Sequence, residues 1–309
     1  MATPNHPTRR RFLQHTLTAG ATALLAPSLA APAAAQDKSK DRWQIGIYTR
    51  PWAKWDWRTA LDAIAEAGFK YAGLMTTKSK TGMVISPNDT LEEARTVGEE
   101  AKKRGLAISS VYSGGYPVRP DALEAGIKGL RKVIDNVVAA GGTSLLLGGT
   151  GDAKLQEPYY KIVAECCDYA AEKGIWMSVK PHGGLNATGP QCRKCIESVG
   201  HKSFRLWYDP GNIFYYSDGK LDPVEDAATV DGLVGGMSVK DFKFVEGSKQ
   251  VDVTPGTGLV DFPKVMARLR KGGFTGGPLV IECLAPGDLK ALLAEAKKAR
   301  AFVEKLVAG

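Results

Sequence analysis

The sequence predicts an α/β fold, a closed (β/α)8 TIM barrel in a single domain, and three observations support this prediction. Strand-like and helix-like segments alternate eight times between residues 43 and 309. The last four strand-like segments stop at ionisable side chains, which lie roughly 30 to 40 residues apart, as expected when each parallel strand is followed by a helix. No Gly-x-Gly-x-x-Gly turn follows the first strand, so the chain lacks the fingerprint of an open dinucleotide-binding sheet.

The helices are predicted from apolar residues at helical spacing and from the glycines that follow them. A glycine follows each of the first four predicted helices, where a residue with left-handed backbone angles turns the chain into the next strand. These glycines are Gly68, Gly105, Gly141 and Gly174. The predicted strands cover residues 43–49, 71–75, 106–111, 144–147, 175–179, 204–208, 237–239 and 279–281. The predicted helices cover residues 57–67, 91–104, 121–139, 158–173, 189–199, 222–230, 261–271 and 288–307.

The N-terminal segment has the three parts of an export signal. Arg9, Arg10 and Arg11 precede a weakly apolar run over residues 16–30, and small residues follow at 33–35. This pattern predicts a twin-arginine signal peptide over residues 1–35, a linker over 36–42 and a barrel over 43–309. The apolar run is shorter than the roughly 20 strongly apolar residues of a stable membrane span. We therefore expect a periplasmic or other extracytoplasmic protein that is exported by the twin-arginine route.

Composition limits the classes of function. The formal net charge is +8, but Lys and Arg are interspersed with acidic residues, which favours a small anionic or neutral partner and gives no indication of nucleic-acid binding. Two of the four histidines lie in the predicted signal, so His182 and His201 alone remain for the barrel and a histidine-rich zinc site is excluded. Cys192 and Cys195 have the spacing of a redox pair. Their place in a predicted helix favours buried thiols, and the sequence leaves a disulfide open.

Several short motifs, taken in order, are similar to one known family. They are Gly68-Phe69-Lys70, Ala171-Glu172-Lys173-Gly174-Ile175, Tyr208-Asp209-Pro210-Gly211-Asn212, Ser238-Val239-Lys240-Asp241 and Gly256-Thr257-Gly258-Leu259-Val260-Asp261-Phe262. Together they resemble the sugar phosphate isomerase/epimerase family, which has a xylose isomerase-like TIM barrel. The resemblance extends from about Trp43 to the C-terminus.

The resemblance implies a metal site that this sequence only partly retains. The family usually binds one divalent metal through Glu, Asp, His and Glu at the ends of strands five to eight. Asp209 and Glu282 match two of these ligands, whereas Lys180 stands where the first Glu is expected and Ser238 where the His is expected. A lysine ammonium within about 4 Å of two carboxylates competes with a divalent cation, because it neutralises the same charges. The resulting expectation is either no cofactor or Mn²⁺ or Mg²⁺ at an altered site.

Three interpretations of Lys180 remain open from sequence. In the first, its ammonium replaces the metal. In the second, it forms a salt bridge that only prevents repulsion between buried acids. In the third, Asp209 and Glu282 still bind a metal together with His182 and with Asn212 or Asp241.

The candidate chemistry is proton transfer next to a carbonyl. Glu282 is the predicted base, His182 the second acid or base, and Lys180 or Lys240 the electrophile or a Schiff-base amine. The predicted substrate-binding residues are Asp209, Asn212, Asp241, Trp52 and Tyr112. Residues 242–260 form the longest predicted loop and a candidate lid.

The sequence thus favours an exported carbohydrate-active enzyme that binds a small sugar or sugar derivative. The reaction expected is isomerisation, epimerisation or elimination. The alternative is a non-catalytic sugar-binding barrel that has lost the family metal site. The sugar and the oligomeric state are not determined by the sequence.

Overall fold

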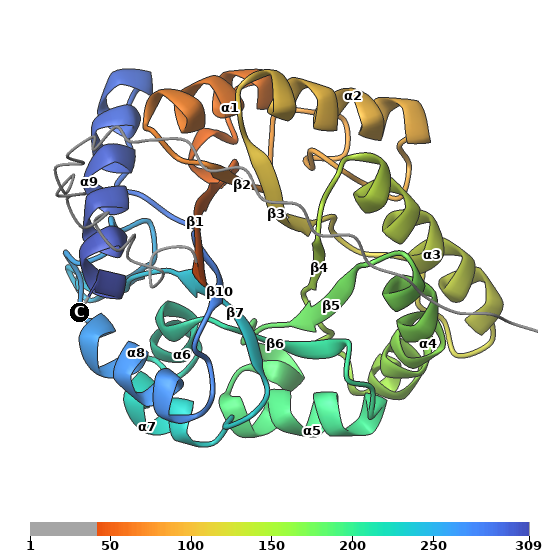
Figure 1. Cartoon of the computed structure of the whole chain (residues 1–309). Helices are drawn as coiled ribbons and strands as arrows, with labels where there is room; N and C mark the ends of the chain where they lie inside the picture. The colour runs from red at the N-terminus through yellow and green to blue at the C-terminus, as the bar shows by residue number, and fades with distance from the viewer. Residues whose placement is uncertain (1–41, 309) are drawn as a thin grey trace, which may run out of the picture. The chain divides into compact units, whose positions relative to one another are not determined.

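The protein is described by a computed structural model over residues 42–308, and these residues form a closed barrel surrounded by helices (Figure 1). The barrel strands follow the order β1-β10-β7-β6-β5-β4-β3-β2, and every neighbouring pair is parallel. The predicted fold class is confirmed. The predicted signal peptide and residues 36–41 of the predicted linker lie outside the described residues.

The observed elements agree closely with the predicted ones. The barrel strands are β1 (Trp43–Tyr48), β2 (Tyr71–Leu74), β3 (Ala107–Tyr112), β4 (Ser144–Leu147), β5 (Trp176–Val179), β6 (Phe204–Tyr208), β7 (Val234–Val239) and β10 (Gly277–Ile281). The helices are α1 (Trp57–Glu66), α2 (Leu91–Lys103), α3 (Leu123–Ala139), α4 (Ala153–Glu172), α5 (Gly189–Val199), α6 (Pro210–Tyr216), α7 (Pro223–Ala228), α8 (Phe262–Lys271) and α9 (Leu289–Ala308), with short 3-10 turns η2 (Arg50–Trp52) and η3 (Gly184–Asn186).

Three elements differ from the sequence prediction. Helix α4 begins at Ala153, before the predicted start at Pro158, because the Asp152 side chain caps its N-terminus. Helix α6 was not predicted, although Asp209 caps it and Pro210 occupies its first position. The predicted loop at 242–260 contains a small antiparallel hairpin, β8 (Lys243–Val245) and β9 (Ser248–Gln250).

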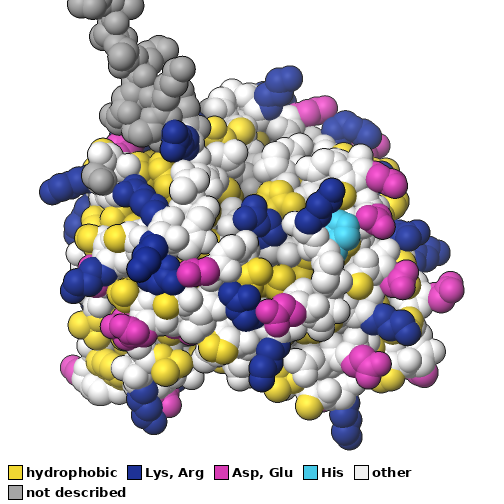
Figure 2. All heavy atoms as spheres, turned by 60° about the horizontal axis from the view of Figure 1, so that its bottom comes forward, with side chains coloured by type: hydrophobic (Ala, Val, Ile, Leu, Met, Phe, Trp, Pro, Cys, Tyr) yellow, Lys and Arg dark blue, Asp and Glu magenta, His cyan; other side chains and the backbone are white. Residues whose placement is uncertain are grey.

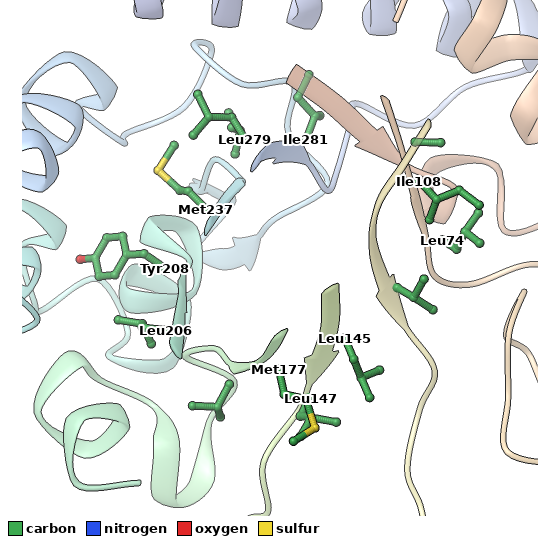
Figure 3. Packing of buried hydrophobic residues seen from close by; sticks show 14 of the residues in the cluster. Leu74, Ile108, Leu145, Leu147, Met177, Leu206, Tyr208, Met237, Leu279 and Ile281 are labelled. Carbon is green, nitrogen blue, oxygen red and sulfur yellow. The ribbon is translucent and has the colours of Figure 1, made fainter. Parts of the chain in front are cut away.

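Strand side chains alternate between two apolar layers. Alternate side chains of a barrel strand point inward and outward. The outward ones form the main core between the strands and the helices, and ten of them are labelled in Figure 3. A smaller cluster contains the residues at the intervening strand positions, among them Tyr48, Leu146, Trp207 and Val280. This cluster therefore fills the barrel interior, below the strand ends.

The surface charges, the cysteines and the helices each bear on an expectation from the sequence. The face in Figure 2 mixes Lys and Arg with Asp and Glu side chains, as the dispersed charges of the sequence indicated. All five cysteines are buried and unpaired, so Cys192 and Cys195 form no disulfide in this structure. None of the helices between residues 42 and 308 is both long and apolar enough to cross a bilayer.

Candidate active site at the barrel mouth

Strand alternation brings five charged side chains together at the C-terminal end of the barrel. Each lies two residues beyond an inward-facing position, so it faces the barrel axis as well. The pairs are Tyr48 and Arg50, Ser178 and Lys180, Trp207 and Asp209, Ser238 and Lys240, and Val280 and Glu282. We call Arg50, Lys180, Asp209, Lys240 and Glu282 the ion cluster. The C-terminal end of a barrel is where this fold carries its active sites.

Both lysines of the ion cluster bridge its two carboxylates. Lys180 Nζ lies 3.1 Å from Asp209 Oδ2 and 2.6 Å from Glu282 Oε2. Lys240 Nζ lies 3.3 Å from Asp209 Oδ2 and 2.6 Å from Glu282 Oε1. Arg50 Nη1 donates to Glu282 Oε1 at 2.8 Å. Both lysines and both carboxylates are almost completely buried, whereas the Arg50 side chain is 34% exposed.

Neighbouring backbone and amide groups fix the geometry of the ion cluster. Asp209 Oδ1 accepts the backbone N–H of Asn212 and so caps α6. The Asn212 side chain accepts from Lys240 Nζ at 3.1 Å and donates to the Pro181 carbonyl. Gly211 allows α6 to pass close to Lys240, because a Cβ there would lie 2.8 Å from Lys240 Cγ. The Asp-Pro-Gly-Asn motif therefore positions two members of the cluster at once.

Glu282 is the most heavily hydrogen-bonded carboxylate of the site. Besides its three cationic partners, it accepts from Ser238 Oγ at 2.8 Å. Burial alone would raise the pKa of Glu282, but Lys180, Lys240 and Arg50 outweigh it and hold the pKa well below its usual range. Its two oxygens already accept from four donors, so neither is free to take a proton from a substrate. The arrangement therefore does not favour the predicted role of Glu282 as the general base.

Lys240 and Arg50 are held in their charged forms. Burial acts to lower the pKa of Lys240, but Asp209 and Glu282 overcome it and raise the pKa above the ordinary value. Burial also acts to lower the pKa of Arg50, but Cys283, Glu282 and Asp252 outweigh it and raise the pKa above the ordinary value. A Schiff base needs a neutral amine, so the geometry does not favour Lys240 in that role. It favours Lys240 as a fixed positive charge.

The residues present do not fit a divalent metal in this arrangement. The two matching carboxylates, Asp209 and Glu282, already accept two ammonium groups each. Ser238, at the place of the family histidine, donates to Glu282. Between residues 42 and 308, no group of three or more His, Cys, Asp and Glu side chains has the geometry of a metal site. Lys180 lies where the metal-replacement interpretation requires it.

His182 lies at the mouth beside two tyrosines. Its ring centroid is 6.4 Å from that of Tyr112 and 6.1 Å from that of Tyr216. The ring is exposed, yet partial desolvation and then the charge of Lys180 lower its pKa to about 4. His182 is therefore a neutral imidazole at neutral pH, in a form that can accept a proton.

Two predicted substrate-binding residues lie away from this opening. Trp52 is completely buried in the main core, so its ring offers no accessible face in this conformation. Asp241 follows the outward-facing Val239 by two residues, and its oxygens accept four backbone N–H groups. The donors are Phe242, Gly256, Gly258 and Val260. Asp241 thus holds the loop that follows β9, and the geometry gives its predicted contact with substrate no support.

Sequence reasoning missed Arg50, the third cation of the cluster. It also did not identify Ser238 as a hydrogen-bond partner of Glu282. Counting in twos from Tyr48 would have found Arg50, because the same alternation places the other four charges. Nothing in the local sequence showed that the ring of Trp52 would turn into the core.

Residues 61–306 match the family described as xylose isomerase-like TIM barrel. One curated relative, an inosose dehydratase from Glaesserella parasuis serovar 5 (strain SH0165), is 29% identical over 157 residues, which are 46% of this chain and 52% of the relative. The match thus spans about half the length of that relative.

Solved structures show the same barrel at low sequence identity. A xylose isomerase domain protein from Planctomyces limnophilus has a TM-score of 0.66 at 18% identity, covering 86% of this chain and 97% of the other. A D-allulose 3-epimerase from Methylomonas sp., in complex with D-allulose, has a TM-score of 0.64 at 18% identity, covering 85% and 97%. A D-psicose 3-epimerase from Clostridium cellulolyticum H10, with D-tagatose, has a TM-score of 0.66 at 15% identity, covering 85% and 99%. From the match over most of its length, the chain belongs to the xylose isomerase-like TIM barrel family.

Proposed function

We propose that this protein is a carbohydrate-active enzyme that transfers a proton next to the carbonyl of a sugar or a related cyclic polyol, as in isomerisation, epimerisation or dehydration. The observation that carries the proposal is the ion cluster, with a neutral imidazole beside it at the barrel mouth. The names of the similar proteins, an inosose dehydratase and sugar epimerases, support the same type of reaction.

In the proposed reaction, His182 takes the proton from the carbon next to the carbonyl. The electrons of the broken C–H bond move to the carbonyl oxygen and give an enolate. The ammonium groups of Lys180 and Lys240 and the guanidinium of Arg50 stabilise its negative charge, because fixed buried charges act strongly where water is excluded. In dehydration, His182 gives the proton to a hydroxyl on the carbon beyond the enolate, which leaves as water while the carbonyl re-forms. In isomerisation, the hydroxyl on the deprotonated carbon passes its proton to the former carbonyl oxygen, and His182 protonates the former carbonyl carbon. In epimerisation, a water molecule protonates the opposite face of the same carbon, and His182 gives its proton to the hydroxide that remains.

The test is a panel of keto- and aldo-sugars and inososes incubated with the protein in D₂O. Proton NMR would follow deuterium incorporation next to the carbonyl, together with formation of the isomer, epimer or dehydrated product. We expect His182→Gln to abolish exchange, whereas His201→Gln should leave it unchanged, since His201 pairs with the exposed Asp168 outside the ion cluster. Failure of all panel members to exchange or to form product would reject the proposed enzyme.

The alternative is a sugar-binding barrel without catalysis, and one observation favours it. Every carboxylate of the ion cluster is already occupied by cations, and the lowered pKa of Glu282 and that of His182 make both groups weak bases. Such a protein would bind a panel sugar but would exchange no proton. Binding without exchange, unaffected by His182→Gln, would establish the alternative.

We also propose that the protein is exported, which rests on the sequence of residues 1–35. Replacing Arg9, Arg10 and Arg11 by lysine should retain the precursor in the cytoplasm. Cell fractionation measures this directly. An unchanged periplasmic yield would remove the export proposal and leave the reaction untouched.

A further inference from the structure

A cavity of about 350 Å³ opens beside the ion cluster, on the side of β1 and β10. Its size lies within the roughly 300 to 1,000 Å³ of small-molecule sites, toward the lower end. Its wall includes Arg50, Lys54, Thr76, Asp252 and Glu282. A ligand in this cavity therefore contacts the cluster directly through Glu282 and Arg50.

Arg50 has unused hydrogen-bonding capacity at this wall. A guanidinium carries five N–H donors, and Arg50 makes one side-chain hydrogen bond within residues 42–308, from Nη1 to Glu282. Its contact with Asp252 is 3.8 Å long, and Asp252 is 58% exposed, so this pair is weak. The guanidinium geometry matches a carboxylate through two parallel hydrogen bonds.

The cavity wall has more positive than negative charge when it is taken with the ion cluster. Arg50, Lys54, Lys180 and Lys240 contribute four positive charges, and Asp209, Asp252 and Glu282 contribute three negative ones. Lys54 has no carboxylate within 4.0 Å among the described residues. A ligand with one negative charge would balance the site.

A further group at the wall lacks a partner. Thr76 Oγ1 is buried without a hydrogen bond to any described residue, and such atoms normally have one. A ligand hydroxyl in the cavity could supply it. Trp55, also on the wall, offers an apolar surface of the kind that packs against the C–H face of a sugar.

From these observations we propose that the substrate is an acidic sugar, a polyhydroxylated molecule with one carboxylate. Arg50 and Lys54 hold the carboxylate in the cavity, and the hydroxyl groups contact Thr76. This inference rests on the proposed function and names its class of substrate. Lys54 acts here in specificity and takes no part in the reaction.

The test compares acidic and neutral forms of the same sugars by isothermal titration calorimetry with the full chain. The probes are D-glucuronate against D-glucose and D-galacturonate against D-galactose. We expect at least one acid to bind on the order of tenfold more tightly than its neutral partner at low salt, as one charge-assisted contact allows. Added salt should reduce this advantage, because Lys54 is exposed.

Three variants make the assignment to this cavity specific. Lys54→Gln should weaken acid binding by roughly threefold and leave neutral-sugar binding unchanged. Asp252→Asn should strengthen acid binding, since it removes the carboxylate that competes for Arg50. The matched control is Lys128→Gln on α3, across the barrel from β1 (Figure 1), which should change neither.

The outcomes separate this inference from the proposed function. Equal or tighter binding of the neutral sugars, with proton exchange intact, would overturn the acidic-sugar inference alone. If the parent prefers the acidic sugar and the ratio of its affinities for the acidic and the neutral sugar stays the same in Lys54→Gln and in Asp252→Asn, the assignment to this cavity is overturned. Absence of binding and exchange for every acid and neutral sugar would overturn both proposals.

Discussion

Two buried carboxylates at the ends of neighbouring strands have opposite kinds of partners. Glu282 follows β10 and accepts hydrogen bonds from three cationic side chains and a serine. Asp241 follows β7 and accepts hydrogen bonds from backbone N–H groups alone. The difference comes from strand alternation, because Glu282 faces the barrel axis and Asp241 faces outward. An acidic residue at the end of a barrel strand is therefore a candidate for the active site only when its side chain faces the barrel axis.

The largest effect on stability is expected at Asp241. Asp241→Ala removes the acceptor of four backbone N–H groups, and we expect it to lower the free energy of unfolding by about 3 to 5 kcal/mol. Denaturant titration measures this. The control, Asp261→Ala, removes the partly exposed cap of α8 from the same loop and should cost about 1 kcal/mol. If Asp241→Ala costs no more than the control, Asp241 is not the anchor of the loop.

The glycines of the same loop test the close approach to Asp241. A Cβ on Gly258 would lie 2.4 Å from both Asp241 Oδ1 and the Phe242 carbonyl oxygen. Gly258→Ala should therefore destabilise the protein by about 2 to 4 kcal/mol, because the loop must move away from its anchor. Gly247→Ala is the control in the hairpin turn, where a Cβ meets nothing although the positive φ of 79° adds some strain. Equal losses in the two variants would contradict the packing argument.

A smaller loss of stability is expected in the ion cluster. Lys180→Met leaves Asp209 and Glu282 with Lys240 and Arg50 alone, and should cost about 2 to 3 kcal/mol as well as activity. Adding Asp209→Asn removes one of the uncompensated charges and should recover about 1 kcal/mol. Chemical denaturation of the two single variants and the double variant completes the cycle. Independent, additive effects would show that Lys180 and Asp209 do not interact energetically.

The contrast between Glu282 and Asp241 shows which parts of the fold and of the site the sequence could predict. The fold followed from eight alternating segments and from Gly68, Gly105 and Gly141, because strand and helix periods are local properties. The inward charges at 180, 209, 240 and 282 also followed from their places at strand ends. Alternation also places Asp241 outward, two residues beyond Val239, and counting it would have corrected the expectation that Asp241 binds substrate. Trp52 lies in the 3-10 turn η2, where alternation no longer sets the direction of a side chain, so its burial in the core did not follow from the sequence.

The smallest effect is the pH dependence contributed by His182. Its pKa is lowered to about 4 in the folded protein, from an ordinary value near 6.5. The neutral ring is the proposed base, so kcat/KM should stay constant from pH 7 downward and fall only as the pH approaches about 4. An acid limb near pH 6.5 would contradict the shifted value.

The lowered pKa of His182 should also make the free energy of unfolding depend on pH. The unfolded chain takes up the proton first, near pH 6.5, so the contribution of the neutral ring is complete above that pH and is lost as the pH falls toward about 4. His182→Gln should flatten this part of the stability profile slightly, because the ring is exposed. His201→Gln should leave the contribution of His182 in place. A steeper profile in His182→Gln than in the parent would contradict the sign.

The central claim is that lysine ammonium groups occupy the place of a divalent metal, and metal binding tests it most directly. The mature protein, dialysed against Mn²⁺ or Mg²⁺, is analysed for bound metal by mass spectrometry, beside the double variant Lys180→Glu with Ser238→His. We predict well below one metal ion per chain and a melting temperature unaffected by chelation in the parent, and clear Mn²⁺ binding in the double variant, which restores two ligands and removes a competing cation. One tightly bound metal ion per chain in the parent, with loss of stability and activity on chelation, would contradict the account.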